Sequence, residues 1–275
     1  MYKVKIKDFD LEQNMQSGQC FRWNKLSENT YEVIAFGKYL TMQQDKEEFI
    51  FSCTEEEFKK IWSNYFDLQT DYGAVKNGAA EDEFMMKAIE YGSGIRILRQ
   101  EFFETLISFL ISQRKSIPAI RTSIERLCEA FGEEIADKKY AFPTASRLRS
   151  LNEKETEYLL NECGLGYRGR YILQAADDMK FYENGHEDRF LNMTYEEALK
   201  DIMHFNGAGI KVANCVVLFS LHKLSACPVD VWVQKIIDEE YGGIKPLWMS
   251  DDNAGIYQQY AFFYKRSTSR SLGKN

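Results

Sequence analysis

The chain lacks the features that mark several common protein classes. It has no apolar run near the roughly 20 residues that a membrane-spanning helix needs, and it has no internal repeat or low-complexity stretch. Its three histidines, His186, His204 and His222, show no metal-binding spacing, and His204 is favoured as a structural residue or a phosphate neighbour. Positive charge is not in excess either, because the formal net charge is −7. We therefore expect no membrane span and no metal, and a nucleic-acid partner would need a local basic surface.

Closely spaced cysteines are also missing. Six cysteines are spread along the chain without a C-x-x-C pair, which argues against structural zinc and against an iron–sulfur cluster. In a reducing compartment such cysteines are mostly buried thiols. The first seven residues alternate charged and bulky side chains, which is typical of a strand and not of a signal peptide. These features predict a cytoplasmic protein.

The N-terminal part carries strand patterns. Alternating residues predict strands at 31–36, 39–42 and 48–51, with a turn at Gly37-Lys38. Thr54 and Glu57 then predict a helix that opens with a capping box, in which side chain and backbone bond reciprocally. We expect a small antiparallel β domain with flanking helices over residues 1–93.

Nearly everything from about Glu83 onward has helical periodicity. Apolar residues recur at three- and four-residue spacing in four segments, which are 102–111, 117–131, 171–179 and 212–221. Thr194 and Glu197 form a second predicted capping box. The prediction is an α+β protein whose second domain, residues 94–275, is large and all-α.

A tight hairpin is predicted at about residues 203–211. Gly207 and Gly209 bracket one small residue between two helical patterns. Backbone amides at the start of the second helix can bind a phosphate oxygen without reading base sequence. On this pattern alone, an ordinary helix–helix turn is the favoured alternative.

Lys211 and Asp230 add a chemical signal to the hairpin. Lys211 falls in the first turn of the helix that follows, where the positive end of the helix dipole disfavours an ammonium ion and favours a neutral, nucleophilic amine. Asp230 follows Pro228-Val229 and precedes another apolar helix, where it would serve as an ionised N-cap. Taken singly, Lys211 is more simply a surface lysine and Asp230 merely a cap. Together, flanking one helix after the hairpin, they indicate a catalytic pair.

The residues around this pair resemble a known family. The segment 207–215 (GAGIKVANC), followed by Pro228-Val229-Asp230, resembles the helix-hairpin-helix DNA glycosylases, and within them the 8-oxoguanine DNA glycosylase/lyases of the Ogg type. The likeness continues in four further segments in family order, which are 17–23, 94–100, 125–132 and 164–171. It covers most of the chain and suggests a bacterial member.

The resemblance implies an enzyme of base excision repair that flips the damaged nucleotide out of duplex DNA. Lys211 would attack the sugar carbon, expel 8-oxoguanine and form a Schiff base whose β-elimination can nick the strand. Asp230 would stabilise positive charge on the sugar and help to deprotonate the lysine. No cofactor or metal is implied. The expected partner is double-stranded DNA containing 8-oxoguanine, bound by a monomer.

Four further residues would form the base pocket by resemblance. Cys215 and Phe262 would sandwich the flipped base, Gln258 would bond its Watson–Crick edge, and the carbonyl of Gly18 would accept from N7–H, a proton that guanine lacks. Cys215 follows Lys211, and Phe262 follows Gln258, by one helical turn. The alternatives are a core cysteine, a core phenylalanine, and a solvated face holding Gln258 and Gln259.

The DNA-contacting residues depart from the eukaryotic pattern. Arg114 stands where an asparagine fills the vacated base stack, and Ala119 stands where an arginine reads the opposite cytosine. Tyr167 and Arg168 remain as candidates for wedging beside the orphaned base and contacting it. We therefore predict weak discrimination of the base opposite the lesion.

Two further positions differ from eukaryotic members. Trp232 replaces a histidine, so its phosphate contact is open, and Lys265 replaces an aspartate. With Gly207 and Gly209 of the hairpin, Arg114, Tyr167, Arg168 and Trp232 complete the predicted DNA-binding set. Lys115 and Arg121 are additional candidates for the DNA backbone, although periodicity alone makes them an ordinary solvated helix edge.

Two other function classes stay open on the sequence. A glycosylase for another lesion, for instance an alkylated purine, would keep Asp230 but need neither Lys211 nor Gly18. A non-catalytic DNA-binding module would keep the hairpin and lose the chemistry.

Overall fold

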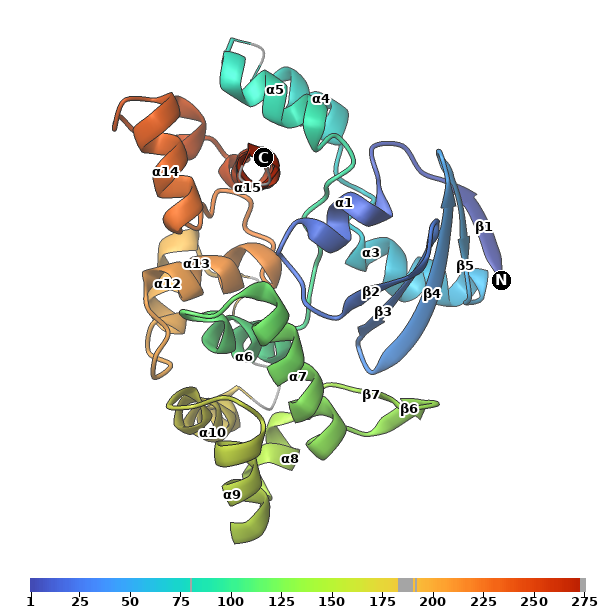
Figure 1. Cartoon of the computed structure of the whole chain (residues 1–275), viewed down its shortest axis with the longest axis vertical. Coiled ribbons are helices and arrows are strands. Elements are labelled where there is room, and N and C mark those ends of the chain that lie inside the picture. The colour runs from blue at the N-terminus through green and yellow to red at the C-terminus, as the bar shows by residue number, and fades with distance from the viewer. Residues whose placement is uncertain (80, 183–189, 191, 273–275) are drawn as a thin grey trace.

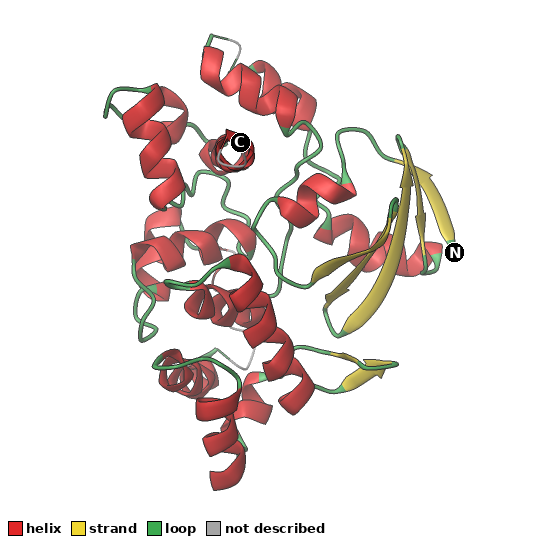
Figure 2. Cartoon of the chain, viewed as in Figure 1, coloured by secondary structure: helices red, strands yellow, loops and turns green. Residues whose placement is uncertain are grey.

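The computed structural model describes residues 1–79, 81–182, 190 and 192–272 (Figure 1). His186 lies outside these described residues. Strands gather on one side of the molecule and helices make up the rest (Figure 2), in agreement with the predicted α+β class. In the part of the chain that the structure describes, no helix is both long enough and apolar enough to span a membrane.

The N-terminal part is a five-stranded antiparallel sheet. Its strands lie in the order β1-β5-β4-β3-β2, and their bounds are β1 Tyr2–Lys5, β2 Trp23–Ser27, β3 Thr30–Ala35, β4 Lys38–Asp45 and β5 Glu48–Phe51. The predicted strands are confirmed. The strand β2 was not predicted because only its first residue, Trp23, is buried, so this edge strand shows no apolar alternation.

Short helices cover the inner face of the sheet (Figure 1). They are α1 (Leu11–Gln16), α2 (Glu55–Glu57), a π-helical stretch at Phe58–Trp62 and α3 (Ser63–Tyr65). The Thr54 cap is confirmed, since its hydroxyl accepts from the Glu57 amide at 3.1 Å. The reciprocal half of that box does not form, because the Glu57 carboxylate accepts from Trp62 Nε1 at 2.9 Å.

The remaining elements are mainly helical. They are α4 (Tyr72–Asn77), α5 (Glu83–Tyr91), α6 (Phe102–Ser112), α7 (Ile117–Phe131), α8 (Ala145–Arg149), α9 (Glu153–Glu162), α10 (Arg168–Asp178), η2 (Met179–Phe181), α12 (Tyr195–Ile202), α13 (Ile210–Phe219), α14 (Val231–Glu240), η3 (Leu247–Ser250) and α15 (Ala254–Leu272). The predicted helices and the Thr194 capping box are confirmed. A small hairpin of β6 (Glu134–Ala136) and β7 (Lys139–Tyr140) interrupts the helices and was not predicted.

Two hydrophobic cores organise the chain. The smaller one joins the sheet to the helices that cover it, and the larger one fills the helical part. Tyr72, Met85 and Ala88 belong to the larger core, and α5 packs against α15 although it precedes residue 94. The domain boundary after residue 93 stays a prediction.

A buried aspartate connects the two parts. Asp67, which follows α3 and is fully buried, accepts from Tyr72 and pairs with Arg99 at 2.8 Å. Its other carboxylate oxygen lies 3.0 Å from Nε2 of His222, in the loop after α13. The helix that carries Lys211 is thereby tied at its far end to the N-terminal part.

Candidate active site

Lys211 lies in the first turn of α13 and is half-buried. Its Nζ stands 5.1 Å from the centre of the Phe109 ring, and Phe109 is buried on α6, which packs against α13. Phe109 in turn stacks on Phe219 and meets the edge of Phe21. The Lys211 amine therefore lies over a cluster of aromatic rings, Phe109 with Phe21 and Phe219, at the edge of the larger core.

Asp230 is the N-cap of α14, as predicted. Its Oδ1 accepts from the amides of Trp232 at 2.9 Å and Val233 at 3.0 Å. These bonds fix the direction of the carboxylate. Because one oxygen accepts both, Oδ2 is the oxygen that remains for a ligand.

The charges of Lys211 and Asp230 both affect the pKa of the Cys215 thiol. The Cys215 side chain is buried, and this burial raises the pKa of the thiol. The Lys211 charge lowers the pKa of Cys215, the Asp230 carboxylate raises it, and a hydrogen bond with Lys211 lowers it. The charges of both predicted catalytic residues therefore act on one buried thiol.

The hairpin before α13 needs glycine at one of its two positions. Gly207 has a φ of +84°, and a Cβ there would stand 2.4 Å from the ring of Tyr171. Gly209 is the N-cap of α13 with a φ of −72°, and a Cβ there would meet open space. Gln113 also donates to the Gly207 carbonyl at 3.1 Å, so α6 and α10 both support the turn. The amides of α13 consequently start from a rigid hairpin.

Gly18 and Phe262 come together although they are far apart in sequence. Gly18 has a φ of +81°, and a Cβ there would stand 3.3 Å from the Phe262 ring and 3.2 Å from an Arg266 nitrogen. The Arg266 guanidinium lies 5.1 Å from the centre of the Phe262 ring and donates to the Gln16 carbonyl. Both predicted pocket residues therefore meet at the joint between the loop after α1 and the helix α15.

Gln258 and Gln259 are not on a solvated face. The two residues are only 3% and 4% exposed, and Gln259 Nε2 donates to Gln258 Oε1 at 2.9 Å. The position one turn before Phe262 therefore holds a buried amide, as a pocket requires. Cys215 is core-like in burial, whereas Phe262 is only half-buried.

The family models match two consecutive parts of the chain. Residues 1–106 match the N-terminal domain of 8-oxoguanine DNA glycosylase, and residues 107–246 match the HhH-GPD superfamily of base excision DNA repair proteins. The N-glycosylase/DNA lyase of Saccharomyces cerevisiae is 32% identical over 82% of this chain and 67% of its own length. The chain belongs to the 8-oxoguanine DNA glycosylase/lyase family.

Solved structures agree with this membership. The Clostridium acetobutylicum 8-oxoguanine glycosylase/lyase, solved with double-stranded DNA containing cytosine opposite 8-oxoguanine, is 34% identical with a TM-score of 0.86 and covers 98% of this chain and 99% of its own. The 3-methyladenine DNA-glycosylase of Archaeoglobus fulgidus, at 16% identity, a TM-score of 0.72 and coverage of 97% and 99%, shares the fold alone.

In this glycosylase/lyase, the segment after α6 is held by the protein itself. Arg168 is buried, donates to the carbonyls of Leu165 and Gln113, and stacks 4.5 Å from the centre of the exposed Tyr167 ring. Arg114 is exposed and has a φ of +54°, and Ala119 is exposed as well. Tyr167 and Arg114 are thus free to meet DNA, whereas the described contacts of Arg168 support the loop. Direct contacts with DNA stay predictions.

Lys115 and Arg121 form internal bonds instead of presenting a solvated edge. Lys115 donates to Ser123 at 2.6 Å and to the Gly164 carbonyl at 2.5 Å. Arg121 donates to the Trp23 carbonyl at 3.0 Å and the Met15 carbonyl at 3.3 Å. Their charges therefore serve mainly to join elements of the glycosylase/lyase.

Trp232 on α14 and Lys265 on α15, the two positions that differ from eukaryotic members, have different surroundings. Trp232 is half-buried in the first turn of α14, with Lys235 Nζ at 5.8 Å from its ring centre. Lys265 pairs with Glu239 at 2.8 Å and with Glu240, both on α14. Lys265 consequently links α15 to α14.

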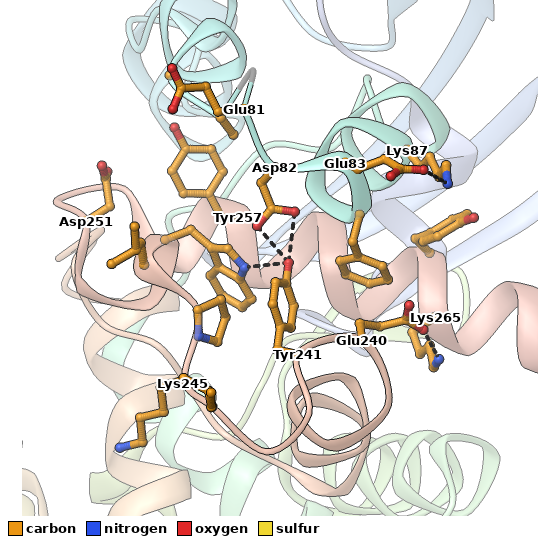
Figure 3. A pocket seen from close by; sticks show the side chains of 18 of the residues that line it. Glu81, Asp82, Glu83, Lys87, Glu240, Tyr241, Lys245, Asp251, Tyr257 and Lys265 are labelled. Atoms are coloured by element: carbon orange, nitrogen blue, oxygen red, sulfur yellow. Dashed lines mark hydrogen bonds and ion pairs between the residues drawn. The ribbon is translucent and has the colours of Figure 1, made fainter.

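A cavity of about 1340 Å³ lies between the α4–α5 segment, the end of α14 and α15 (Figure 3). Within it, Tyr241 donates to Asp82 at 2.9 Å and accepts from Trp248 at 3.1 Å. None of the predicted site residues is among those described as lining it. The acidic residues Glu81, Asp82 and Glu83 line this cavity (Figure 3), and Lys211 is not among its described lining residues.

Sequence reasoning missed Phe109, Tyr171, Gln259 and Arg266. Phe109 belongs to a continuous apolar helix, in which no pattern separates a residue under the amine from the rest of the core. Gln259 and Arg266 stand three residues before and four after Phe262, so helical spacing from Phe262 could have indicated both. Among the described residues, no group of three or more His, Cys, Asp or Glu could hold a metal.

Proposed function

We propose that this enzyme is a bifunctional DNA glycosylase/lyase that flips 8-oxoguanine out of duplex DNA and excises it through a Schiff base on Lys211. The observation that carries the proposal is the placement of Lys211 in the first turn of α13, over Phe109, and of Asp230 as the N-cap of α14, with both charges acting on the buried Cys215 thiol. Family membership supplies the class of reaction, and the Clostridium relative, solved with a duplex containing 8-oxoguanine, supplies the lesion.

The chemistry follows from these groups. Neutral Nζ of Lys211 forms a bond to C1′ while the bond from C1′ to the base breaks, and the base leaves with the electron pair. Asp230 stabilises the positive charge that develops on the sugar and takes the proton that the amine releases. Ring opening gives the Schiff base, and β-elimination then breaks the C3′–O bond and nicks the strand.

The base would be read from three sides. The Gly18 carbonyl accepts from N7–H, Cys215 and Phe262 hold the two faces of the base, and Gln258 bonds its Watson–Crick edge. The contact of Gly18 with Phe262 and the burial of Gln258 support this assignment. A purine must leave the stack to reach this pocket, so flipping precedes chemistry.

The hairpin would bind the DNA backbone. The amides at the start of α13 and the positive end of its dipole suit a phosphate oxygen, with Gly207 and Gly209 shaping the turn. Tyr167 would wedge beside the orphaned base, Arg114 would occupy the vacated stack, and Trp232 would lie near the strand. Because all these groups belong to one chain, we propose a monomer that acts on DNA in a bacterial cytoplasm.

Borohydride trapping tests the nucleophile. Incubation with an 8-oxoguanine duplex and borohydride should give a covalent protein–DNA adduct, and Lys211→Gln should abolish it. Lys200→Gln, which changes an exposed lysine on α12, is the matched control and should trap like the parent protein. A full yield of adduct from a folded Lys211→Gln variant would refute the proposal.

The same duplex set distinguishes the alternatives. Duplexes containing an alkylated purine or uracil should not be processed. Excision of the alkylated purine in preference to 8-oxoguanine would favour the alkylated-purine class, and binding without any excision would favour a non-catalytic module.

The base opposite the lesion should matter little. Ala119 has no side chain that could read cytosine, and Arg168 is bonded to two backbone carbonyls. Single-turnover excision rates opposite the four bases should therefore lie within about tenfold, the discrimination that one good base contact provides. A strong preference for cytosine would overturn this prediction.

A further inference from the structure

Gln259 is buried beside the residue that would read the base. Its Nε2 donates to Gln258 Oε1 at 2.9 Å, and both side chains are buried. Gln259 Oε1 is also buried and has no hydrogen-bond partner among the described residues. A buried, unsatisfied acceptor is costly, so this arrangement calls for a functional explanation.

Two neighbouring amides can bond in only two ways. In the arrangement that the structure holds, Gln259 donates and Gln258 accepts, so Gln258 keeps both Nε2 hydrogens and one Oε1 lone pair for a ligand. In the other arrangement both amides are turned over, and Gln258 donates to Gln259. Turning Gln258 alone would place two donors against each other. The orientation of the Gln258 amide is therefore coupled to that of the Gln259 amide.

The orientation of an amide decides which purine edge it matches. The Watson–Crick edge of guanine presents an acceptor, O6, beside a donor, N1–H. The edge of adenine presents a donor, the N6 amino group, beside an acceptor, N1. An amide fixed in one orientation pairs with one of these edges, and the same amide turned over pairs with the other.

The contact with Gly18 cannot make this distinction. The N7–H proton is present in 8-oxoguanine and equally in 8-oxoadenine, so a carbonyl that accepts from N7–H selects oxidation and not the kind of purine. Selection between the two oxidised purines falls to the group at the Watson–Crick edge, which is Gln258 in the proposed function.

Helix geometry places Gln259 on the side of α15 that faces Gly18. Gln259, Phe262 and Arg266 follow one another at spacings of three and four, and the last two contact Gly18. Gly255 brings the start of α15 against α13, because a Cβ there would stand 2.3 Å from Leu218. The amide pair is therefore held on a helix that has little freedom to shift.

We propose that Gln259 is a positioning residue that fixes the Gln258 amide in the orientation matching oxidised guanine and so excludes oxidised adenine. The inference rests on the proposed function, since it requires Gln258 to face the flipped base.

Two variants test the proposal. Gln259→Glu offers only acceptors and draws Gln258 Nε2 toward itself, which turns the reading amide over. Gln259→Leu removes both polar groups at similar volume and leaves Gln258 unrestrained. Gln234→Leu, at an exposed glutamine on α14 whose side chain donates to Asp238, is the matched control.

The measurement is the single-turnover excision rate of 8-oxoguanine and of 8-oxoadenine, each opposite cytosine in the same duplex. The ratio of the two rates should fall about tenfold or more in both Gln259 variants, the discrimination typical of one bidentate amide contact, and remain unchanged in Gln234→Leu. Cleavage and trapping at a preformed abasic site, which need no base pocket, should stay at the parent level.

The outcomes separate the two proposals. A parent protein that does not excise 8-oxoguanine refutes the proposed function. If the parent protein excises 8-oxoguanine, the proposed function stands and only the role of Gln259 is at stake. That role is refuted if folded Gln259→Leu keeps the parent ratio of the two excision rates. An equal loss of rate on both lesions leaves the ratio unchanged and refutes it too. Gln259→Leu decides the matter where the buried charge of Gln259→Glu prevents folding.

Discussion

Glu104 shows how a single half-buried carboxylate can make stability depend on pH. It lines a small cavity with Cys20 and Arg22, next in the chain to the Gly18 loop. Burial raises the pKa of Glu104 to about 8, with Glu101 and Glu125 raising it further and the Arg22 guanidinium opposing them. The folded protein thus favours the protonated acid at a pH where an unfolded chain carries the anion.

Because the folded-state pKa is raised from 4.5, the stability that Glu104 contributes is present below pH 4.5 and is lost as pH rises through about 8. Glu104→Gln keeps the neutral form at every pH. The Tm of the variant should match that of the parent at pH 4.5 and exceed it by roughly 2–5 °C at pH 9. Thermal unfolding by circular dichroism measures both. The exposed control Glu129→Gln should have the Tm of the parent at both pH values. A Tm difference between Glu104→Gln and the parent that is the same at pH 4.5 and pH 9 would contradict the raised pKa of Glu104.

At the scale of elements, the hairpin before α13 has two glycine positions, of which only one requires glycine. Gly207 combines a positive φ with contact against Tyr171, whereas Gly209 has ordinary backbone angles and open space around it. The sequence pattern Gly-x-Gly does not distinguish them. The packing of α10 against the hairpin makes the difference.

Gly207→Ala should therefore lower the free energy of unfolding by roughly 1–3 kcal/mol and weaken DNA binding, because the turn must move away from Tyr171. Gly209→Ala is the matched control and should change stability by less than about 0.5 kcal/mol. Urea unfolding and a fluorescence titration with an abasic-site duplex measure the two effects. Equal losses in both variants would show that the Tyr171 contact is not the cause.

At the scale of the whole molecule, Asp67 joins the two hydrophobic cores. Burial alone would raise the pKa of Asp67, but hydrogen bonds and charge from His222 and Arg99 outweigh burial and lower it. The depressed value means that the stability from this carboxylate is present above its ordinary pKa of 3.8 and is lost as pH falls below that value. The anchor for α13 therefore operates at neutral pH.

Asp67→Asn should lower the free energy of unfolding by about 2–4 kcal/mol at pH 7, because it leaves Arg99 without its buried anion. The difference from the parent should persist at pH 5 and narrow below about pH 3.8. Asp177→Asn removes an exposed partner of Lys180 and should cost less than about 0.5 kcal/mol. Urea unfolding at pH 7, 5 and 3.5 checks this, and a difference that widens in acid would contradict it.

The sequence by itself determined the fold class and most helix and strand positions, because periodicity, caps and motif order are local properties of the chain. It also predicted the pairing of Lys211 with Asp230. The edge strand β2 and the hairpin β6–β7 were not predicted, since neither has an alternation of apolar residues. The family resemblance supplied Gly18, Cys215, Gln258 and Phe262.

Only the tertiary structure decided which side chains meet. It placed Phe109 under Lys211, Tyr171 against Gly207, Arg266 on Phe262, and Gln259 on Gln258. It also turned Lys115 and Arg121 inward. Apart from the adjacent glutamines, these contacts depend on how helices pack across long sequence separations, or on which helix face is covered. A pattern of residue types along one chain carries no direct record of either.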